Sequence, residues 1–163
     1  NYKVYMAKDV NAFAMANGCI RVYSGLMDMM TDNEVEAVIG HEMGHVALGH
    51  VKKGMQVALG TNAIRAAAGL SPLAMDGGLS AAADARCESF VAGGAFDHSG
   101  MTTRSEICAA GPIGSASSVC SYWQNSPAHY ANITNASFTS MGVACWFCST
   151  AEGQYTYWTV TFN

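Results

Sequence analysis

The chain has 163 residues, enough for one ordinary domain or two small ones. Half of the residues are apolar and 12% are charged, a composition that is typical of globular proteins and excludes a disordered chain. The net charge of −4 excludes the basic surface that nucleic-acid binding requires, and Asn62 and Arg65 interrupt the most apolar region, residues 55–70, so no membrane span is predicted.

A β-hairpin is predicted over residues 11–23. Two apolar runs, residues 12–16 and 19–23, flank Asn17-Gly18, a dipeptide that favours a two-residue turn between antiparallel strands. The hairpin supplies an edge strand early in the chain.

A helix is predicted to begin at Thr31. Thr31 and Glu34 have the spacing of a capping box, in which each side chain bonds to the backbone of the other residue. Gly40 and Gly44 each cost about 1 kcal/mol relative to alanine inside a helix, which indicates close approach of a neighbouring element. The helix is expected to bury one apolar stripe, formed by Val35, Val38, Ile39, Met43 and Val46.

The same helix carries the sequence HEMGH at residues 41–45, an HExxH motif. Histidines at positions i and i+4 lie about 40° apart on one helix face, so both imidazoles can reach one tetrahedral zinc. Glu42 lies beside that face, where it can take a proton from a metal-bound water. His50 lies about 140° further round a continuous helix than His45, so we expect an exposed histidine outside the metal site.

Residues 1–66 resemble the HtpX-like gluzincin metallopeptidases, especially the bacterial periplasmic lipoprotein members. The hairpin, the capped helix and the sequence HEMGHVALGH occur in that family's order. The resemblance implies a zinc ion held by His41 and His45, with Glu42 as general base. It also implies that a substrate, a peptide or an unfolded protein, adds as an extended strand to the edge of the hairpin.

The third zinc ligand of that family is a glutamate in an E-x-x-A-D pattern on a later helix. The one similar string in this chain, residues 80–84, begins with Ser80, and a serine hydroxyl is a poor zinc ligand. Glu88, one helical turn beyond Asp84, is the substitute that we predict. The motif therefore indicates a zinc endopeptidase whose third ligand the family pattern does not identify.

A second pattern, helices followed by a pair of strands, occupies residues 62–163. A helix is predicted over residues 79–90, and a strand pair joined by a turn at residues 149–154 ends the chain. The fold class is therefore α+β, an α–β–α sandwich preceded by a β-hairpin and a long HExxH helix. The alternating strand positions are Met141, Val143, Cys145 and Phe147, followed by Thr156, Trp158, Val160 and Phe162.

Residues 62–163 resemble a CAP domain, the module of cysteine-rich secretory, antigen-five and pathogenesis-related proteins. The segments FDHS at residues 96–99 and SPAHYANI at residues 126–133 occur in the family's order. The resemblance implies a cleft built from His98, Glu106 and His129, which in some members binds a divalent metal or a small ligand. The family's second glutamate has no clear counterpart, and Ser126 stands near its expected place.

Six cysteines are many for a cytosolic protein of this size, and five lie in the second half of the chain. Cys145 and Cys148 are three residues apart on a predicted strand, so they point to opposite faces and are not expected to pair with each other. Disulfides to other partners are predicted, in the periplasm or outside the cell.

Two interpretations of function stay open. In the first, a partial metallopeptidase segment, residues 1–66, is fused to a CAP domain, residues 62–163, and the protein is a zinc-dependent endopeptidase. In the second, the protein is a non-catalytic secreted CAP module that binds a small ligand, a metal or a protein partner. Ser80 distinguishes them, because a peptidase requires glutamate there. The shared residues 62–66 predict a fusion, natural or engineered, in which one helix belongs to both parts.

Overall fold

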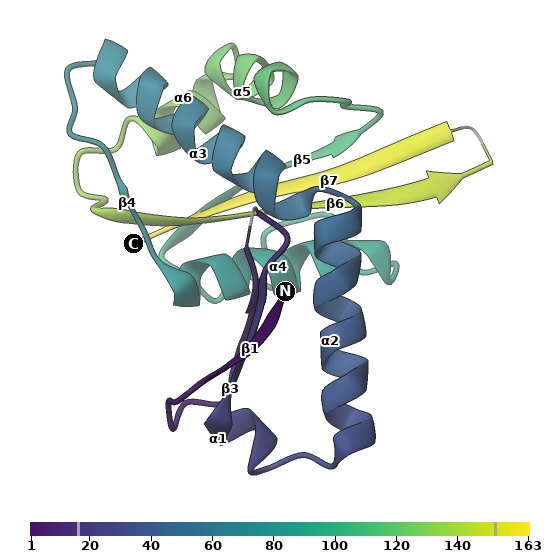
Figure 1. The fold of residues 1–163 in the computed structure, drawn as a ribbon. Helices are drawn as coiled ribbons and strands as arrows, with labels where there is room; N and C mark the ends of the chain where they lie inside the picture. The colour runs from purple at the N-terminus through teal and green to yellow at the C-terminus, as the bar shows by residue number, and fades with distance from the viewer. Residues whose placement is uncertain (16, 152) are drawn as a thin grey trace. The chain divides into compact units, whose positions relative to one another are not determined.

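The computed structural model describes residues 1–15, 17–151 and 153–163 (Figure 1). Ala16, in the predicted hairpin, and Glu152, in the predicted turn, lie outside the described residues. The chain forms two compact units, an N-terminal unit, Asn1–Lys52, and a C-terminal unit, Lys53–Asn163. Each unit contains its own sheet and helices, which confirms the predicted α+β class.

The predicted hairpin is present in the N-terminal unit. β2 (Ala12–Ala14) and β3 (Ile20–Tyr23) are antiparallel. The turn differs from the prediction: the Met15 N–H donates to the Cys19 carbonyl at 2.8 Å, so three residues rather than two lie between the paired positions. Gly18 follows in the left-handed region, at φ +78°, where a side chain would be strained. Gly18 therefore belongs to a loop that is longer than the two-residue turn predicted from Asn17-Gly18.

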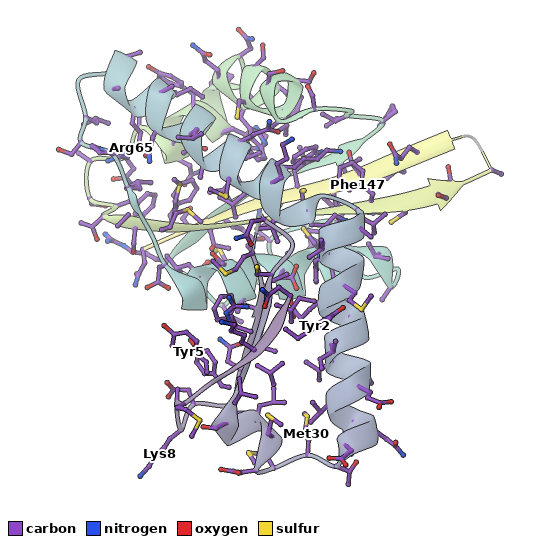
Figure 2. The ribbon with its side chains drawn as sticks, viewed as in Figure 1. Tyr2, Tyr5, Lys8, Met30, Arg65 and Phe147 are labelled. Carbon is purple, nitrogen blue, oxygen red and sulfur yellow. The ribbon has the colours of Figure 1, made fainter. Side chains whose placement is uncertain are left out.

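β1 (Tyr2–Tyr5) completes a three-stranded sheet of order β1-β3-β2 and runs parallel to β3. The sequence pattern did not indicate this strand, because all four of its residues are exposed and no alternation of buried and exposed positions marks it. Tyr2 and Tyr5 extend from the strand as exposed rings, and Tyr5 stacks on Tyr23 with ring centroids 5.6 Å apart (Figure 2).

The short helix α1 (Ser24–Met27) follows β3 directly, and its backbone lies close to the loop between β1 and β2. A Cβ atom on Gly25 would lie 2.2 Å from the Lys8 carbonyl oxygen, so only glycine fits. The Gly25 N–H and the Ser24 hydroxyl both donate to the Ala7 carbonyl, at 2.9 and 2.8 Å. These bonds hold the loop before β2 against the end of β3.

The long helix α2 (Asp32–Ala47) packs on β2 and β3 through a narrow apolar strip. Met43, predicted to belong to this strip, is 48% exposed. It lies at the edge of the strip, about 40° beyond Ile39, and a three-stranded sheet is too narrow to cover it. The strip consists of Val35, Val38, Ile39 and Val46, which pack against the buried residues Ile20, Val22 and Leu26.

The explanation predicted for two helix glycines is wrong. A Cβ atom built on Gly40 or Gly44 meets no other described residue within 4 Å. Close approach of a neighbour therefore does not account for either glycine, and the structure offers no other reason for them.

The helix predicted to run on past residue 47 is broken. Gly49 adopts φ +70° and its N–H donates to the Val46 carbonyl, a helix-ending arrangement typical of glycine. α3 (His50–Ala67) starts directly afterwards. Residues 62–66, shared by the two predicted parts, lie within α3.

The C-terminal unit is a layered α–β–α structure around a sheet of order β4-β6-β7-β5. Its strands are β4 (Ala74–Met75), β5 (Ser105–Gly111), β6 (Ser140–Thr150) and β7 (Gly153–Phe162). Figure 1 shows α4 (Gly77–Val91) on one face of this sheet and α3, α5 (Ala116–Gln124) and α6 (Pro127–Ile133) on the other. The predicted sandwich and the predicted helix and strand pair are confirmed.

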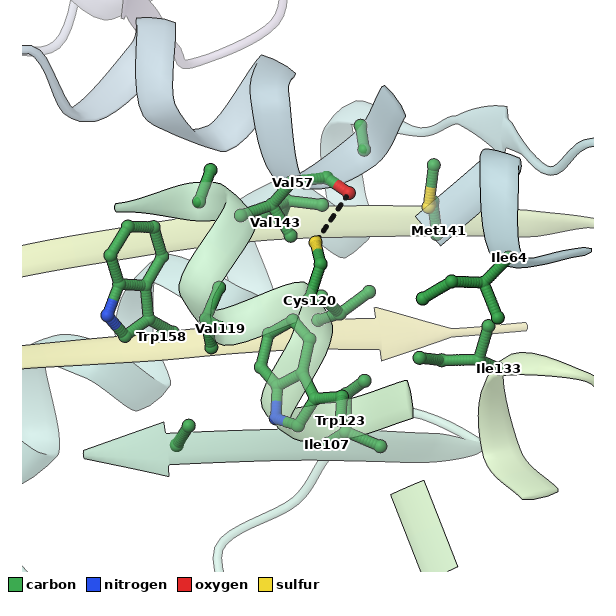
Figure 3. Close-up of a cluster of buried hydrophobic side chains, with 14 of the residues drawn as sticks. Val57, Ile64, Ile107, Val119, Cys120, Trp123, Ile133, Met141, Val143 and Trp158 are labelled. Carbon is green, nitrogen blue, oxygen red and sulfur yellow. Dashed lines mark hydrogen bonds between the residues drawn. The ribbon is translucent and has the colours of Figure 1, made fainter. Parts of the chain in front are cut away.

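The core of the C-terminal unit lies between the sheet and the layer of α3, α5 and α6 (Figure 3). Trp123 and Trp158 are fully buried there, and the predicted alternation along β6 buries Met141, Val143 and Cys145. The Cys120 thiol lies 3.9 Å from the Val57 carbonyl, the contact drawn as a dashed line in Figure 3. The following buried residues form this cluster: Val57, Ala58, Ile64, Leu73, Ile107, Ala109, Ala116, Val119, Cys120, Trp123, Ile133, Phe138, Met141, Val143, Cys145, Trp158, Val160 and Phe162.

No disulfide bond joins any of the six cysteines, all of which lie within the described residues. The predicted disulfides therefore stay a prediction. Cys145 is buried and Cys148 is half-buried on the same strand, β6. Among the described residues, no helix is both long and apolar enough to cross a membrane.

Candidate metal-binding and cleft sites

The HExxH helix begins at the predicted capping box. The Thr31 N–H donates to Glu34 Oε2 at 2.8 Å, and the Thr31 hydroxyl donates to the same oxygen at 2.8 Å. These two bonds hold the pKa of Glu34 below its usual range, and the bond from the Thr31 backbone has the larger effect. The capped turn fixes the start of the helix that carries residues 41–45.

His41 and His45 are brought together on one face of α2. Their Nε2 atoms lie 2.9 Å apart and their rings meet edge to face, with centroids 4.6 Å apart. His41 is exposed and His45 is half-buried. The two nitrogens are at hydrogen-bond distance on one side of α2, close to where two ligands of one tetrahedral metal ion would stand.

Glu42 is half-buried and follows His41 directly in α2. By helical geometry it lies about 60° from the His45 direction and within the strip that faces the sheet. A carboxylate in this position borders both the histidine pair and the hairpin.

His50 differs from its prediction. It is 7% exposed, and its Nδ1 lies 2.9 Å from Nδ1 of His45. The prediction assumed a continuous helix, whereas the turn at Gly49 ends α2 and brings the next residue back toward His45. The glycine directly before His50 was the sequence signal that could have revealed this.

The residues considered for the third ligand lie on α4, in the C-terminal unit. Glu88 is exposed near the end of this helix. Ser80, which replaces the family's glutamate, donates its hydroxyl to the Asp76 carbonyl at 2.8 Å. Ser80 therefore serves the first turn of its own helix.

His98 and Glu106, two of the predicted cleft residues, are in contact. His98 Nδ1 lies 2.9 Å from Glu106 Oε1, with the histidine side chain 58% exposed and the carboxylate fully buried. Arg86 approaches the same carboxylate from α4: its Nη2 donates to Oε1 at 3.0 Å and its Nε to Oε2 at 3.1 Å. Arg86 also donates to the Asp97 carbonyl. The buried charge of Glu106 is thus compensated within the protein.

His129 lies beside this pair. Its Nδ1 is 2.8 Å from the Ser126 hydroxyl, the residue predicted to stand where the family has a second glutamate. Partial burial and then the nearby His98 lower the pKa of His129, while a bond involving the Cys108 backbone opposes the shift. The predicted residues therefore gather in one region.

Two residues of this cluster were missed in the sequence. Cys108 offers a sulfur that lies with His98 and Glu106 in a group whose ligand atoms are all within 4.8 Å of one another, although burial raises its pKa to about 12. Arg86 was detectable, because it is a single cation on the apolar face of its helix, between Ala83 and Phe90. Such a residue indicates a buried anionic partner.

Comparison with known proteins identifies the first part of the chain. Residues 1–108 match the family model for peptidase family M48. Over 68 residues, 42% of this chain and 27% of the relative, the chain is 97% identical to metalloprotease LoiP of Escherichia coli. Over 75 residues, 44% of this chain and 30% of the relative, it is 61% identical to metalloprotease YcaL of the same species. The chain thus spans less than a third of these curated relatives.

Residues 60–162 match the model of the cysteine-rich secretory protein family. A cysteine-rich secretory protein from Staphylococcus aureus is similar in structure, with TM-score 0.54 and 16% identity, over 69% of this chain and 38% of that one. An extracellular protein containing a SCP domain from Bacillus anthracis has a TM-score of 0.54 and 17% sequence identity, over 82% of this chain and 44% of that one. An outer surface protein from Borrelia burgdorferi has a TM-score of 0.53 and 18% sequence identity, over 69% of this chain and 93% of that one.

These structural likenesses show the fold of the C-terminal part, and the two family models together cover almost the whole chain. The chain belongs both to peptidase family M48, through residues 1–108, and to the cysteine-rich secretory protein family, through residues 60–162.

Proposed function

We propose that this protein is a zinc-dependent endopeptidase whose metal site is carried by α2 and whose second part is a CAP module. One observation carries the proposal: Nε2 of His41 and Nε2 of His45 converge to 2.9 Å on one face of the helix. Neutral imidazole is a good zinc ligand, and a peptidase site needs three protein ligands and one open position. The two histidines fit two of these ligand positions.

Glu88 is our proposed third ligand. Its carboxylate is exposed on α4, so it is accessible to an ion. Replacing Glu88 by glutamine keeps its size and removes its charge. We expect the Glu88→Gln variant to bind zinc more weakly, measured against a chelator of known affinity, because a site with two protein ligands holds zinc poorly.

The chemistry follows from the positions of the side chains. When bound by His41 and His45, zinc would polarise the substrate carbonyl and make a neighbouring water more acidic. Glu42 would accept the proton of the attacking water and deliver it to the leaving amine. Its half-buried position beside the histidines supports this role.

The hairpin supports a binding mode for an extended substrate. β2 is an edge of the three-stranded sheet, and α2 packs against it. Asn11 accepts a backbone bond from Tyr23 of β3, and Met15 donates one to Cys19, directly before β3. In an antiparallel ladder the backbone groups of Ala12 and Ala14 therefore point to the outer edge. A peptide or an unfolded segment would pair with these groups as an added strand.

Cleavage of unfolded casein tests the catalytic part of the proposal. We expect Glu42→Gln to lower the rate by about 10²–10⁴-fold, the range of general-base contributions, with little change in zinc content. Glu36→Gln is the matched control, because Glu36 is exposed on the same helix, and it should cleave like the wild type. Equal cleavage by wild type and Glu42→Gln would overturn the assignment.

A second function is favoured by the cluster of His98, Glu106 and Cys108. We propose that this cleft binds a small ligand, a metal or a protein partner while the N-terminal part is non-catalytic. The exposed ring of His98 over a fully buried carboxylate supports a binding role. If cobalt binding survives His45→Ala and is lost in His98→Ala, this second function is the correct one.

The organisation and location of the protein are part of the proposal. We propose a metallopeptidase segment, residues 1–66, and a CAP domain, residues 62–163, in the periplasm or outside the cell. Secretory, extracellular and outer-surface proteins among the structural relatives support this location. Disulfides in the natively purified protein, detected by mass spectrometry before and after reduction, are expected there; free thiols throughout would count against it.

A further inference from the structure

His50 occupies the first position of α3 and is directed at the candidate zinc site. The left-handed turn at Gly49 places it there, and it is 7% exposed. Burying a polar ring is unfavourable unless the ring makes hydrogen bonds, so a buried histidine at this position requires an explanation. The explanation lies in its partner: Nδ1 of His50 is 2.9 Å from Nδ1 of His45.

His45 uses both of its ring nitrogens. Its Nε2 faces Nε2 of His41 at 2.9 Å, and its Nδ1 faces His50. A neutral imidazole carries one hydrogen, on either Nδ1 or Nε2. A nitrogen that binds zinc must present a lone pair, so a zinc-binding His45 must carry its hydrogen on Nδ1.

The acceptor for that hydrogen is then fixed by geometry. The Nδ1–H of His45 donates to Nδ1 of His50, which must accept through its own lone pair and carry its hydrogen on Nε2. In the opposite arrangement His50 donates, and the hydrogen of His45 blocks the nitrogen that zinc needs. One direction of this hydrogen bond therefore prepares His45 for metal, and the other prevents it.

We propose that His50 is a positioning residue for His45: it accepts the Nδ1–H bond, and so fixes both the tautomer and the ring orientation of a zinc ligand. The proposal rests on the zinc site proposed above. The ring nitrogen that faces away from a metal usually bonds to a carboxylate, a backbone carbonyl or water. A neutral imidazole in this place orients the ligand without adding negative charge.

The first test needs no metal. Two-bond ¹H–¹⁵N correlation spectra report the tautomer of each histidine in the zinc-free full chain, at a pH well above the ordinary imidazole pKa. We expect His45 as the Nδ1–H tautomer in the wild type and a mixture of tautomers in His50→Leu, which keeps an apolar side chain in the buried place. In His50→Asn the side-chain oxygen can replace Nδ1 as acceptor, so the Nδ1–H form should return.

The second test is zinc affinity by competition with a chromophoric chelator. Loss of such an orienting partner weakens metal binding by about 10–100-fold, so we expect this loss in His50→Leu and most of the affinity restored in His50→Asn. Val46→Ala is the matched control, because it shortens a side chain that packs on the N-terminal core and leaves every ring of the histidine group in place. It should lower stability and leave the affinity of the folded protein unchanged.

The outcomes separate the two proposals. An Nε2–H tautomer for His45 in the wild type, or wild-type zinc affinity in a folded His50→Leu, would overturn the role of His50. If His50→Leu does not fold, the wild-type tautomer and the affinity of His50→Asn decide the question. If the wild type binds no zinc, the proposed function fails, while the tautomer spectra still show whether His50 orients His45.

Discussion

The two units of this protein differ in the size of their hydrophobic cores. Among the described residues, eighteen buried ones form the main cluster of the C-terminal unit, whereas three, Ile20, Val22 and Leu26, form that of the N-terminal unit. The small unit also exposes apolar side chains, including Val4 at 50% and Met6 at 86%. A region of this size buries too little apolar surface to be more than marginally stable.

The comparison teaches that the HExxH helix and the larger core belong to different units. The C-terminal unit has a layered α–β–α fold that contains the buried ion pair Arg86–Glu106. The N-terminal unit carries the HExxH helix on a narrow sheet, and the chain spans less than a third of the metalloproteases that share this helix. The two histidines proposed as zinc ligands, His41 and His45, therefore stand on a small core, so that core sets how stable their arrangement is.

Removal of a large core side chain should show the difference most strongly. Trp158 is fully buried, so Trp158→Ala should destabilise the C-terminal unit by about 3–5 kcal/mol, while Ile20→Ala, in the smaller core, should cost about 2 kcal/mol. Urea unfolding followed by circular dichroism measures both values. A larger loss in Ile20→Ala would contradict this account of the two cores.

The buried ion pair provides the next test. Arg86→Met leaves the carboxylate of Glu106 buried, and we expect a loss of about 3 kcal/mol, toward the low end for such changes because His98 remains in contact. The double variant Arg86→Met, Glu106→Gln should recover much of this stability. If the double variant is no more stable than the single one, burial of the charge is not the cause.

The helix cap should have a smaller effect, confined to the N-terminal unit. Thr31→Ala removes the hydroxyl that bonds Glu34, and N-cap losses of this kind cost about 1 kcal/mol. Hydrogen exchange of the first turn of α2 should quicken, while the strands β6 and β7 should be unaffected. Asn33→Ala, an exposed change in the same turn, is the control, and equal acceleration in it would contradict the role of the cap.

The pH dependence that His129 gives to stability should show the smallest effect. Burial lowers the pKa of His129, so the unfolded chain binds a proton more readily than the folded protein. The stability that the neutral His129 contributes to the folded protein is therefore fully present above the usual imidazole pKa, about 6.5. It falls as the pH drops through and below that value. His129→Gln should flatten this part of the stability curve measured by thermal unfolding, and an unchanged slope would exclude His129 as the cause.

Local patterns in the sequence predicted much of the fold. The capping box at Thr31, the hairpin around Gly18 and the alternation from Met141 to Cys145 depend on neighbours along the chain, so the sequence displays them. β1 gives no such signal, because its residues are exposed on both faces and only its pairing with β3 defines it. Met43 was assigned to the core because the width of the sheet is a tertiary property.

The candidate sites were predictable to different degrees. The contact of His41 with His45 follows from helical spacing alone, and the structure has it. The contacts of His50 with His45 and of Arg86 with Glu106 depend on a helix break and on two elements that meet in space. A glycine before His50 and a lone cation on an apolar helix face were the signals available for them.

Zinc content tests the central claim most directly. Elemental mass spectrometry of the wild type, of His45→Ala and of the control His129→Ala gives the number of zinc ions per chain. The account predicts one zinc in the wild type and in His129→Ala, and none in His45→Ala. A wild type without zinc, or zinc that remains in His45→Ala, would contradict it.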